Sequence, residues 1–261
     1  MKMTARALRA REDKILGALE HSPGDNTFRG RLYRDGVPTP ASYLKQRVRV
    51  LFVFREPNMR GKPYALDMRD QVRDEKFRPC IAGEREDRSN RGWWNDKVGL
   101  FAHAAASALD GEPEPASFKR FQSVMADGKW NHEVVNRFAY IQIKKVGGGG
   151  TSDASKICEH AERYAQTLKD QISLYRPHIV IGCGLGRSSP ANLLHEHVFV
   201  KEGASRKART GAMWWQWSAA SRPQALLREY HPSVRNVPRA DVYRDVWSSV
   251  REIANKVRMS R

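Results

Sequence analysis

The feature that most constrains the fold is an apolar run at residues 48–54, VRVLFVF, made largely of β-branched and aromatic side chains. A run with so few polar residues is typical of a strand that is buried on both faces. Such strands occur in parallel sheets that carry helices on either side. The run therefore predicts an α/β protein.

Three further strands are predicted along the chain, over residues 139–145 (AYIQIKK), 178–182 (HIVIG) and 225–230. Between the first two of these, Asp153 can cap a helix. The apolar residues of this helix recur at helical spacing, at Ile157, Ala161, Tyr164, Leu168 and Ile172. Strand, helix and strand in this order are typical of a right-handed βαβ unit. A closing helix is predicted over residues 240–257.

The segments together predict a three-layer α/β/α sandwich around a central, mostly parallel, four-stranded sheet. No internal repeat divides the chain, so residues 1–261 are expected to form a single domain. Residues 4–20 have helical spacing of leucine and isoleucine and end at a Ser-Pro-Gly turn. Residues 1–24 are therefore expected to be a basic, helical N-terminal extension.

The chain is strongly basic, with 46 Lys and Arg against 29 Asp and Glu and a formal net charge of +17. Basic residues outnumber acidic ones by 11 to 5 in residues 1–49 and by 15 to 6 in residues 176–261. We expect the two ends to share one surface, and the alternative is two separate solvated surfaces. A charge of this size is usually balanced by a polyanionic partner, which favours DNA over the alternative, an anionic membrane surface.

The sequence predicts no membrane anchor, cofactor or metal. No window approaches ~18 consecutive apolar residues, and residues 1–14 carry several charges where a signal peptide has an apolar core. The three cysteines, Cys80, Cys158 and Cys183, lack C-x-x-C spacing. We expect the protein to reside in the cytoplasm and to associate with the nucleoid through DNA. We also expect it to be a monomer.

Candidate site residues stand beyond the carboxyl ends of the predicted strands, where open α/β sheets bind ligands. Arg55, Glu56 and Asn58 follow the first strand, Gln142 begins the polar end of the second (residues 142–145), and His231 follows the fourth. A carboxylate, an amide and an imidazole are the groups needed to hydrolyse a glycosidic bond to a base. They orient water, hold the base and stabilise the leaving anion.

Four motifs in this order resemble those of the uracil-DNA glycosylase superfamily, above all its bacterial and archaeal branches. Residues 54–58 (FREPN) stand where the family has G-x-D-P or G-E-A-P-G. Residues 140–145 (YIQIKK) stand where it has a strand Asn that leads to a Lys and a loop. Residues 176–182 (RPHIVIG) correspond to its R-P-x-x-I-V-x-x-G strand, and residues 231–233 carry its H-P-S signature. With Arg235, Pro238 and Trp247 after that signature, the resemblance covers about residues 48–247.

The resemblance implies catalytic roles for two residues. Glu56 precedes Pro57 as the family's Asp precedes its Pro, and it would orient the attacking water although its side chain is longer. The alternative is a surface residue or an ion-pair partner of Arg55, which is itself expected beside the substrate. His231 would donate a hydrogen bond to O2 of the departing pyrimidine. The alternative is a histidine that only caps a turn.

Two departures from the family bear on the substrate. Gln142 stands where the family has its base-reading Asn, and an amide can present donor and acceptor either way round. Gln142 alone therefore does not choose uracil over cytosine, and the alternative is an ordinary polar residue at a strand end. Asn58 stands where stricter uracil enzymes have a Tyr that excludes C5 substituents. The smaller Asn58 favours a base with a large C5 group, such as the modified cytosines of some virus genomes.

Aromatic side chains and a wedge are also implied by the resemblance. Phe77, Trp93 and Trp94 are candidates for the aromatic group that stacks on the flipped base, although adjacent tryptophans also serve as core anchors. Residues 234–236 stand where relatives insert a wedge into the duplex. Arg235 there is expected to act as wedge or as phosphate clamp.

The remaining candidates are expected to contact the DNA backbone: Lys145, Gly148, Ser233, Arg235, Asn236, Arg206 and Lys207. Gly148 lies in a run of four glycines, residues 147–150, which is a flexible turn that lets a DNA backbone come close. Residues 201–217 interleave basic residues and tryptophans in a predicted hairpin. The alternative for this hairpin is a solvated basic turn beside a strand that packs its tryptophans inward.

The sequence thus predicts a monofunctional DNA glycosylase that flips a non-standard pyrimidine, hydrolyses its N-glycosidic bond and leaves an abasic site. A C5-modified cytosine, as in defence against viruses with altered DNA, is preferred over uracil repair. The rival from another class is a catalytically silent reader, which would bind DNA without producing abasic sites. A hydrolase of free nucleosides is disfavoured because a charge of +17 serves no purpose with a small neutral substrate.

Overall fold

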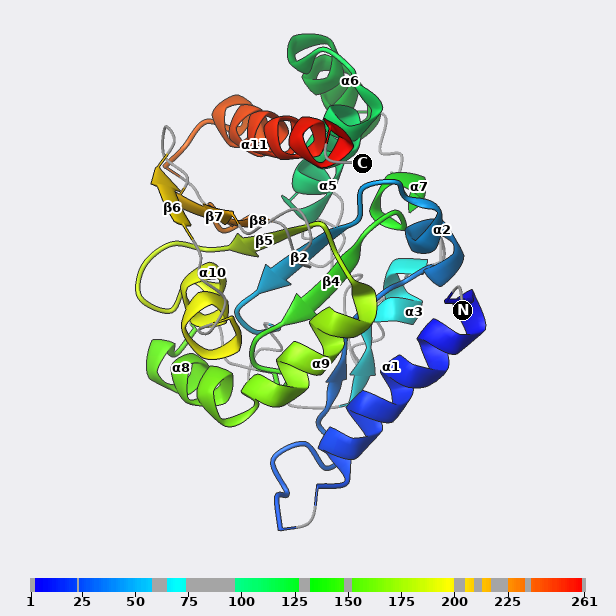
Figure 1. Ribbon diagram of the computed structural model, residues 1–261, viewed down its shortest axis with the longest axis vertical. Helices are drawn as coiled ribbons and strands as arrows, with labels where there is room; N and C mark the ends of the chain where they lie inside the picture. Colours follow the sequence, from blue (N-terminus) through cyan, green and yellow to red (C-terminus); the bar gives the residue numbers. More distant parts are fainter. Residues whose placement is uncertain are drawn as a thin grey trace.

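The computed structural model describes residues 3–22, 24–57, 65–73, 97–126, 132–147, 152–199, 205–208, 213–216, 225–232 and 236–259. A six-stranded sheet forms the middle layer between two layers of helices (Figure 1). In spatial order its strands are β4 (Ala139–Gln142), β2 (Val50–Phe54), β5 (Ile179–Cys183), β8 (Ala225–Glu229), β7 (Met213–Gln216) and β6 (Ser205–Ala208). The first four strands run parallel, so the predicted sandwich with a four-stranded parallel sheet is confirmed.

The sheet is wider than predicted because the hairpin at its edge joins it. Strands β6 and β7 pair antiparallel, as expected for this segment, and β7 also pairs antiparallel with β8. An unpaired edge on β8 would expose a row of backbone donors and acceptors, and pairing with β7 satisfies them.

The central strand β2 has apolar side chains on both faces, so helices must pack on both faces of the sheet. Val50, Phe52 and Phe54 pack in one core cluster, whereas Leu51 and Val53 pack in the other. The first cluster includes side chains of α5 (Gly99–Asp110), α6 (Glu114–Ala126) and α11 (Arg239–Met259). The second includes α1 (Ala5–Glu20), α8 (Ala154–Arg163), α9 (Ala165–Tyr175) and α10 (Pro190–Leu193). Figure 1 shows these two sets on opposite faces.

Shorter elements complete the described chain. They are β1 (Tyr33–Arg34), α2 (Pro40–Lys45), β3 (Leu66–Asp67), α3 (Met68–Arg73), α7 (His132–Val135) and the π-helix η2 (Leu194–Val198). Strands β1 and β3 form a separate parallel pair.

The predicted crossover helix between β4 and β5 is two helices, α8 and α9, which meet at Tyr164. The Tyr164 hydroxyl donates to Asp25 at 2.6 Å, and its ring packs edge-on against Phe28 at 4.8 Å between centroids. These contacts hold the 25–28 loop against the break. The helical spacing of apolar residues does not predict the break between α8 and α9, because Tyr164 keeps that spacing with Ala161 before it and with Leu168 after it.

Helix α1 forms where the N-terminal helix is predicted, and it packs into the core of the domain. Leu8 and Leu16 are fully buried, and Leu8 shares a cluster with strand residues. Glu12 on the same face is also fully buried. Its carboxylate accepts from Val37 N at 2.9 Å, from the Tyr175 hydroxyl at 2.7 Å and from Arg69 at 2.6 Å.

Gly36 is required for this buried contact. Its φ is +137°, and a Cβ built there would lie 2.0 Å from Glu12 Oε1 and 2.7 Å from the Tyr175 hydroxyl oxygen. Both the backbone conformation and the lack of space exclude a larger residue.

We expect Gly36→Ala to lower the free energy of unfolding by about 2 kcal/mol or more, because it adds a steric clash to backbone strain. The matched control is Gly30→Ala, where φ is +65° and no atom lies within 4 Å of the new Cβ. That variant should lose only about 1 kcal/mol. Urea unfolding of both variants measures the difference, and equal losses would contradict the packing argument.

Candidate active site

Candidate side chains gather where the four parallel strands end. The arrowheads of β2, β4 and β5 point to the same side of the sheet (Figure 1). Arg55 and Glu56 follow β2, Lys144 follows β4, Leu185 follows β5 and His231 follows β8. The predicted convergence of segments at one edge therefore rests on the parallel pairing of their strands.

Glu56 forms an ion pair with Lys144. The Lys144 ammonium donates to Glu56 Oε2 at 2.5 Å, and the two side chains are 11% and 4% exposed, respectively. Backbone pairing continues past the strands and sets this register, since Ile143 N donates to Phe54 O at 2.8 Å and Lys144 N donates to Arg55 O at 2.9 Å. An ion pair was one of the alternatives for Glu56, but its partner is Lys144 instead of Arg55.

Lys144 was missed as a site residue, although a signal was present. It stands two residues after Gln142, in the bend that follows β4. Glu56 likewise stands two residues after Phe54, which pairs with Gln142. The parallel register of β2 and β4 thus brings Glu56 and Lys144 together.

Arg55 points the other way, toward the loop after β5. Its guanidinium group donates to the carbonyl oxygen of Leu185, and a Cβ on Gly184 would lie 3.2 Å from Arg55 Nε. Burial lowers the pKa of Arg55, and the nearby Glu56 carboxylate opposes this shift. Arg55 therefore links the end of β2 to the loop of its neighbour β5.

His231 is held in its neutral form. Burial lowers its pKa to about 4, and the positive charges of Arg55 and Lys97 lower it further in the same direction. Lys97, which stands just before α5, was not among the predicted residues. At pH 7 the imidazole therefore has one N–H donor and one nitrogen acceptor.

Gln142 is buried, with 4% of the residue exposed. Its backbone N donates to Asp35 at 2.6 Å, and its backbone oxygen accepts from Lys145 at 3.2 Å. The side-chain oxygen Oε1 has no hydrogen-bond partner among the described residues. Buried amide oxygens are nearly always paired, so an oxygen without a partner among the described residues is a candidate acceptor for a ligand.

Lys145 does not fit its predicted role as a DNA contact. It is 3% exposed, and its ammonium group donates to both oxygens of Asp35 at 2.9 and 2.8 Å. Burial lowers the pKa of Lys145, whereas Asp35 raises it. The ammonium group is therefore engaged inside the protein, and we correct its assignment to that of a structural ion pair.

Glu229, the last residue of β8, is a buried carboxyl group close to the site in sequence. Burial raises its pKa to about 8, and the nearby Asp245 carboxylate adds to this shift. The backbone of Glu229 accepts from Gly184 N at 2.9 Å and so joins the ends of β5 and β8. Sequence inspection missed Glu229, because only the packing of α11 over β8 makes it interior.

Several predicted residues cannot be placed in this geometry. Outside the described residues lie Asn58, Phe77, Trp93, Trp94, Gly148, Ser233 and Arg235. Arg206 and Lys207 lie in β6, where their backbones pair with Trp215 and Trp214 of β7, respectively. Asn236 is exposed before α11.

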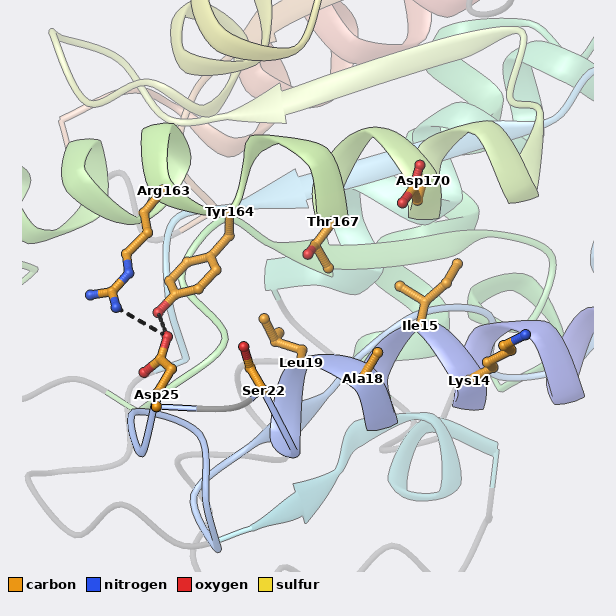
Figure 2. A pocket seen from close by; sticks show the side chains of 11 residues that line it. Lys14, Ile15, Ala18, Leu19, Ser22, Asp25, Arg163, Tyr164, Thr167 and Asp170 are labelled. Atoms are coloured by element: carbon orange, nitrogen blue, oxygen red, sulfur yellow. Dashed lines mark hydrogen bonds and ion pairs between the residues drawn. The ribbon is translucent and has the colours of Figure 1, made fainter.

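A hollow of about 570 Å³ lies elsewhere, between α1 and α9 (Figure 2). Its lining includes Lys14, Leu19, Tyr164 and Asp170, and none of the predicted site residues. Arg163 and the Tyr164 hydroxyl both reach Asp25 at its rim, as the dashed lines in Figure 2 show. The hollow therefore contributes nothing to the candidate active site.

The described ranges hold neither a membrane-spanning helix nor a cluster of metal-ligating side chains. None of the helices there has the length and apolar character needed to cross a bilayer. In the same ranges, no three His, Cys, Asp or Glu side chains lie where they could share a metal ion.

Comparison with known proteins adds no family assignment. No protein-family model matches the sequence, and a search of curated proteins finds no match. The resemblance to the uracil-DNA glycosylase superfamily therefore stays a prediction based on its four motifs.

The raised pKa of Glu229 predicts a pH-dependent stability. A folded carboxyl that holds its proton to about pH 8 stabilises the fold fully below the unfolded pKa of 4.5, and this contribution is lost as the pH rises toward 8. We therefore expect Glu229→Gln to be more stable than the wild type at pH 8, by about 1 to 3 kcal/mol, with little difference at pH 4.5. Urea unfolding across this range measures it. The exposed Glu196→Gln is the control, and parallel pH profiles for all three proteins would contradict the assignment.

Proposed function

We propose that this protein is a DNA glycosylase that hydrolyses the N-glycosidic bond of a flipped, non-standard pyrimidine and leaves an abasic site. The observation that supports it most is that a fixed carboxylate, Glu56, and a neutral imidazole, His231, follow strands that end at the same edge of a parallel sheet. The basic charge of the chain fits DNA as the partner, in the cytoplasm.

Glu56 is proposed to orient the attacking water. Its Oε2 is held by Lys144, so Oε1 can accept a hydrogen bond from water in a fixed direction. Loss of the base leaves positive charge on the sugar, and a nearby carboxylate stabilises that charge. Lys144 acts here as a positioning residue, because its ammonium group holds the carboxylate without touching the substrate.

His231 is proposed to stabilise the leaving base. As negative charge develops on a pyrimidine oxygen, the N–H of a neutral imidazole can donate a hydrogen bond to it. The positive charges of Arg55 and Lys97, which lower the His231 pKa, also favour a developing anion at this place.

Gln142 is proposed to read the base edge with its amide oxygen, which has no hydrogen-bond partner in the part of the chain that the structure describes. An acceptor at this point suits the exocyclic amine of cytosine, and the amide NH2 suits a uracil oxygen. The preference for a C5-modified cytosine over uracil therefore rests on Gln142 together with the small Asn58, and the two substrates are separate arms of the test.

A catalytically silent DNA reader is the second candidate. It is favoured by the 4% exposure of the Glu56 side chain and by the engagement of one of its oxygens with Lys144. A carboxylate so enclosed has less room for water.

We expect Glu56→Gln and His231→Ala each to lower the rate of base release by about two orders of magnitude, with DNA affinity little changed, because both groups act on the transition state. DNA duplexes containing uracil, cytosine or 5-hydroxymethylcytosine are incubated with the protein, and alkali-labile sites are counted. Glu196→Gln is the matched control. Wild-type rates in both variants would exclude the assigned roles, and binding without abasic sites would support the silent reader.

The pKa of His231 gives a second test. Because cations near the imidazole lower its pKa, Arg55→Gln should raise the His231 pKa from about 4 toward 6.5, only partly, since burial is the larger cause. Titration of the imidazole signals by NMR measures both proteins, with Arg187→Gln as control. A wild-type His231 that titrates near pH 6.5 would contradict the neutral-imidazole role.

A further inference from the structure

Leu185 is an apolar side chain set at the edge of the candidate site. It is 39% exposed, and among the described residues the only other exposed large hydrophobic side chain is Met259, at 87%. A single exposed leucine is common on protein surfaces, so exposure alone assigns no role. The inference depends instead on the position of Leu185, in the loop that follows β5.

The loop that holds Leu185 is built to present it. The flanking Gly184 and Gly186 have φ values of +140° and +86°, which residues with a Cβ rarely adopt. Arg55 donates to the Leu185 carbonyl oxygen, and Gly184 N donates to Glu229 O at 2.9 Å. The backbone is thus tied to the ends of β2 and β8, while Leu185 stays 39% exposed.

The loop also lies in the middle of the candidate site. Strand β5, from which it emerges, pairs with β2 on one side and β8 on the other. The ends of these neighbours carry Glu56 and His231. Arg187, exposed in the same loop, adds a positive charge suited to a DNA phosphate.

We propose that Leu185 is a wedge that enters the base stack of duplex DNA and helps to move the target nucleotide into the site. This inference rests on the proposed function. Removal of a base from a duplex breaks stacking, and an apolar side chain that fills the gap offsets part of that cost. A wedge on this loop is separate from residues 234–236, because it comes from the neighbouring strand.

The test uses duplexes with 2-aminopurine beside a uracil or a 5-hydroxymethylcytosine, since 2-aminopurine brightens when it is unstacked. The wild type should brighten the probe, Leu185→Ala should lose most of this signal, and Leu185→Met should keep it. Base release from the duplex should fall about tenfold in Leu185→Ala, and release from single strands by less than about twofold. Met259→Ala is the control for removal of an exposed apolar side chain.

The two readouts separate this inference from the proposed function. Leu185-dependent brightening without base release would support the wedge and refute the glycosylase. Base release with brightening that is equal in wild type and Leu185→Ala would refute the wedge and leave the glycosylase standing. No brightening by the wild type overturns the wedge outright, as does an equal loss of release from duplex and single strand.

Discussion

The buried carboxylate of Asp35 is the contact on which the candidate site depends. It accepts from Gln142 N at 2.6 Å, from Lys145 at 2.8 Å and from Gln171 at 2.9 Å. These bonds fix the chain immediately after β4, so that Lys144 reaches Glu56. A hydrogen-bonded chain continues from Gln171 through Tyr175 to Glu12, which ties α1 to the same network. Because burial of charges is favourable only with full pairing, the network permits few other arrangements of this loop.

The electrostatics of the site follow from that arrangement. Three basic residues act on the candidate site: Lys144, Arg55 and Lys97. Lys144 acts on the Glu56 carboxylate, and the other two act on the pKa of His231. Lys144 fixes the carboxylate, whereas burial, aided by the charges of Arg55 and Lys97, lowers the pKa of His231 and keeps it neutral. Such a balance disfavours an imidazolium but favours an anion that develops on a bound molecule. The same groups would thus serve a reaction whose leaving group is anionic.

Elements defined by local pattern could be predicted from the sequence. The strands predicted at residues 48–54 and 178–182 are present as β2 (Val50–Phe54) and β5 (Ile179–Cys183), because an apolar, β-branched run favours a buried strand. The helical spacing of residues 240–257 is confirmed in α11. Tertiary contacts decided the rest. From the sequence, Lys145 is expected to be an exposed loop lysine. In the structure it is paired with Asp35, which is distant in sequence. Glu229 could be recognised only once α11 packed over β8 and buried it. Lys97 could be recognised only from its effect on the pKa of His231.

The coupling of Glu56 to Lys144 is the point at which the account can be tested most directly. The measurement is a double-mutant cycle of Glu56→Gln and Lys144→Met on the rate of free-base release from duplexes that contain uracil or 5-hydroxymethylcytosine. If Lys144 acts only through Glu56, each single variant should lose at least about tenfold, and the double variant should be no slower than the slower single variant. Losses that multiply, a Lys144→Met protein with the wild-type rate, or no base release by the wild type would contradict the account.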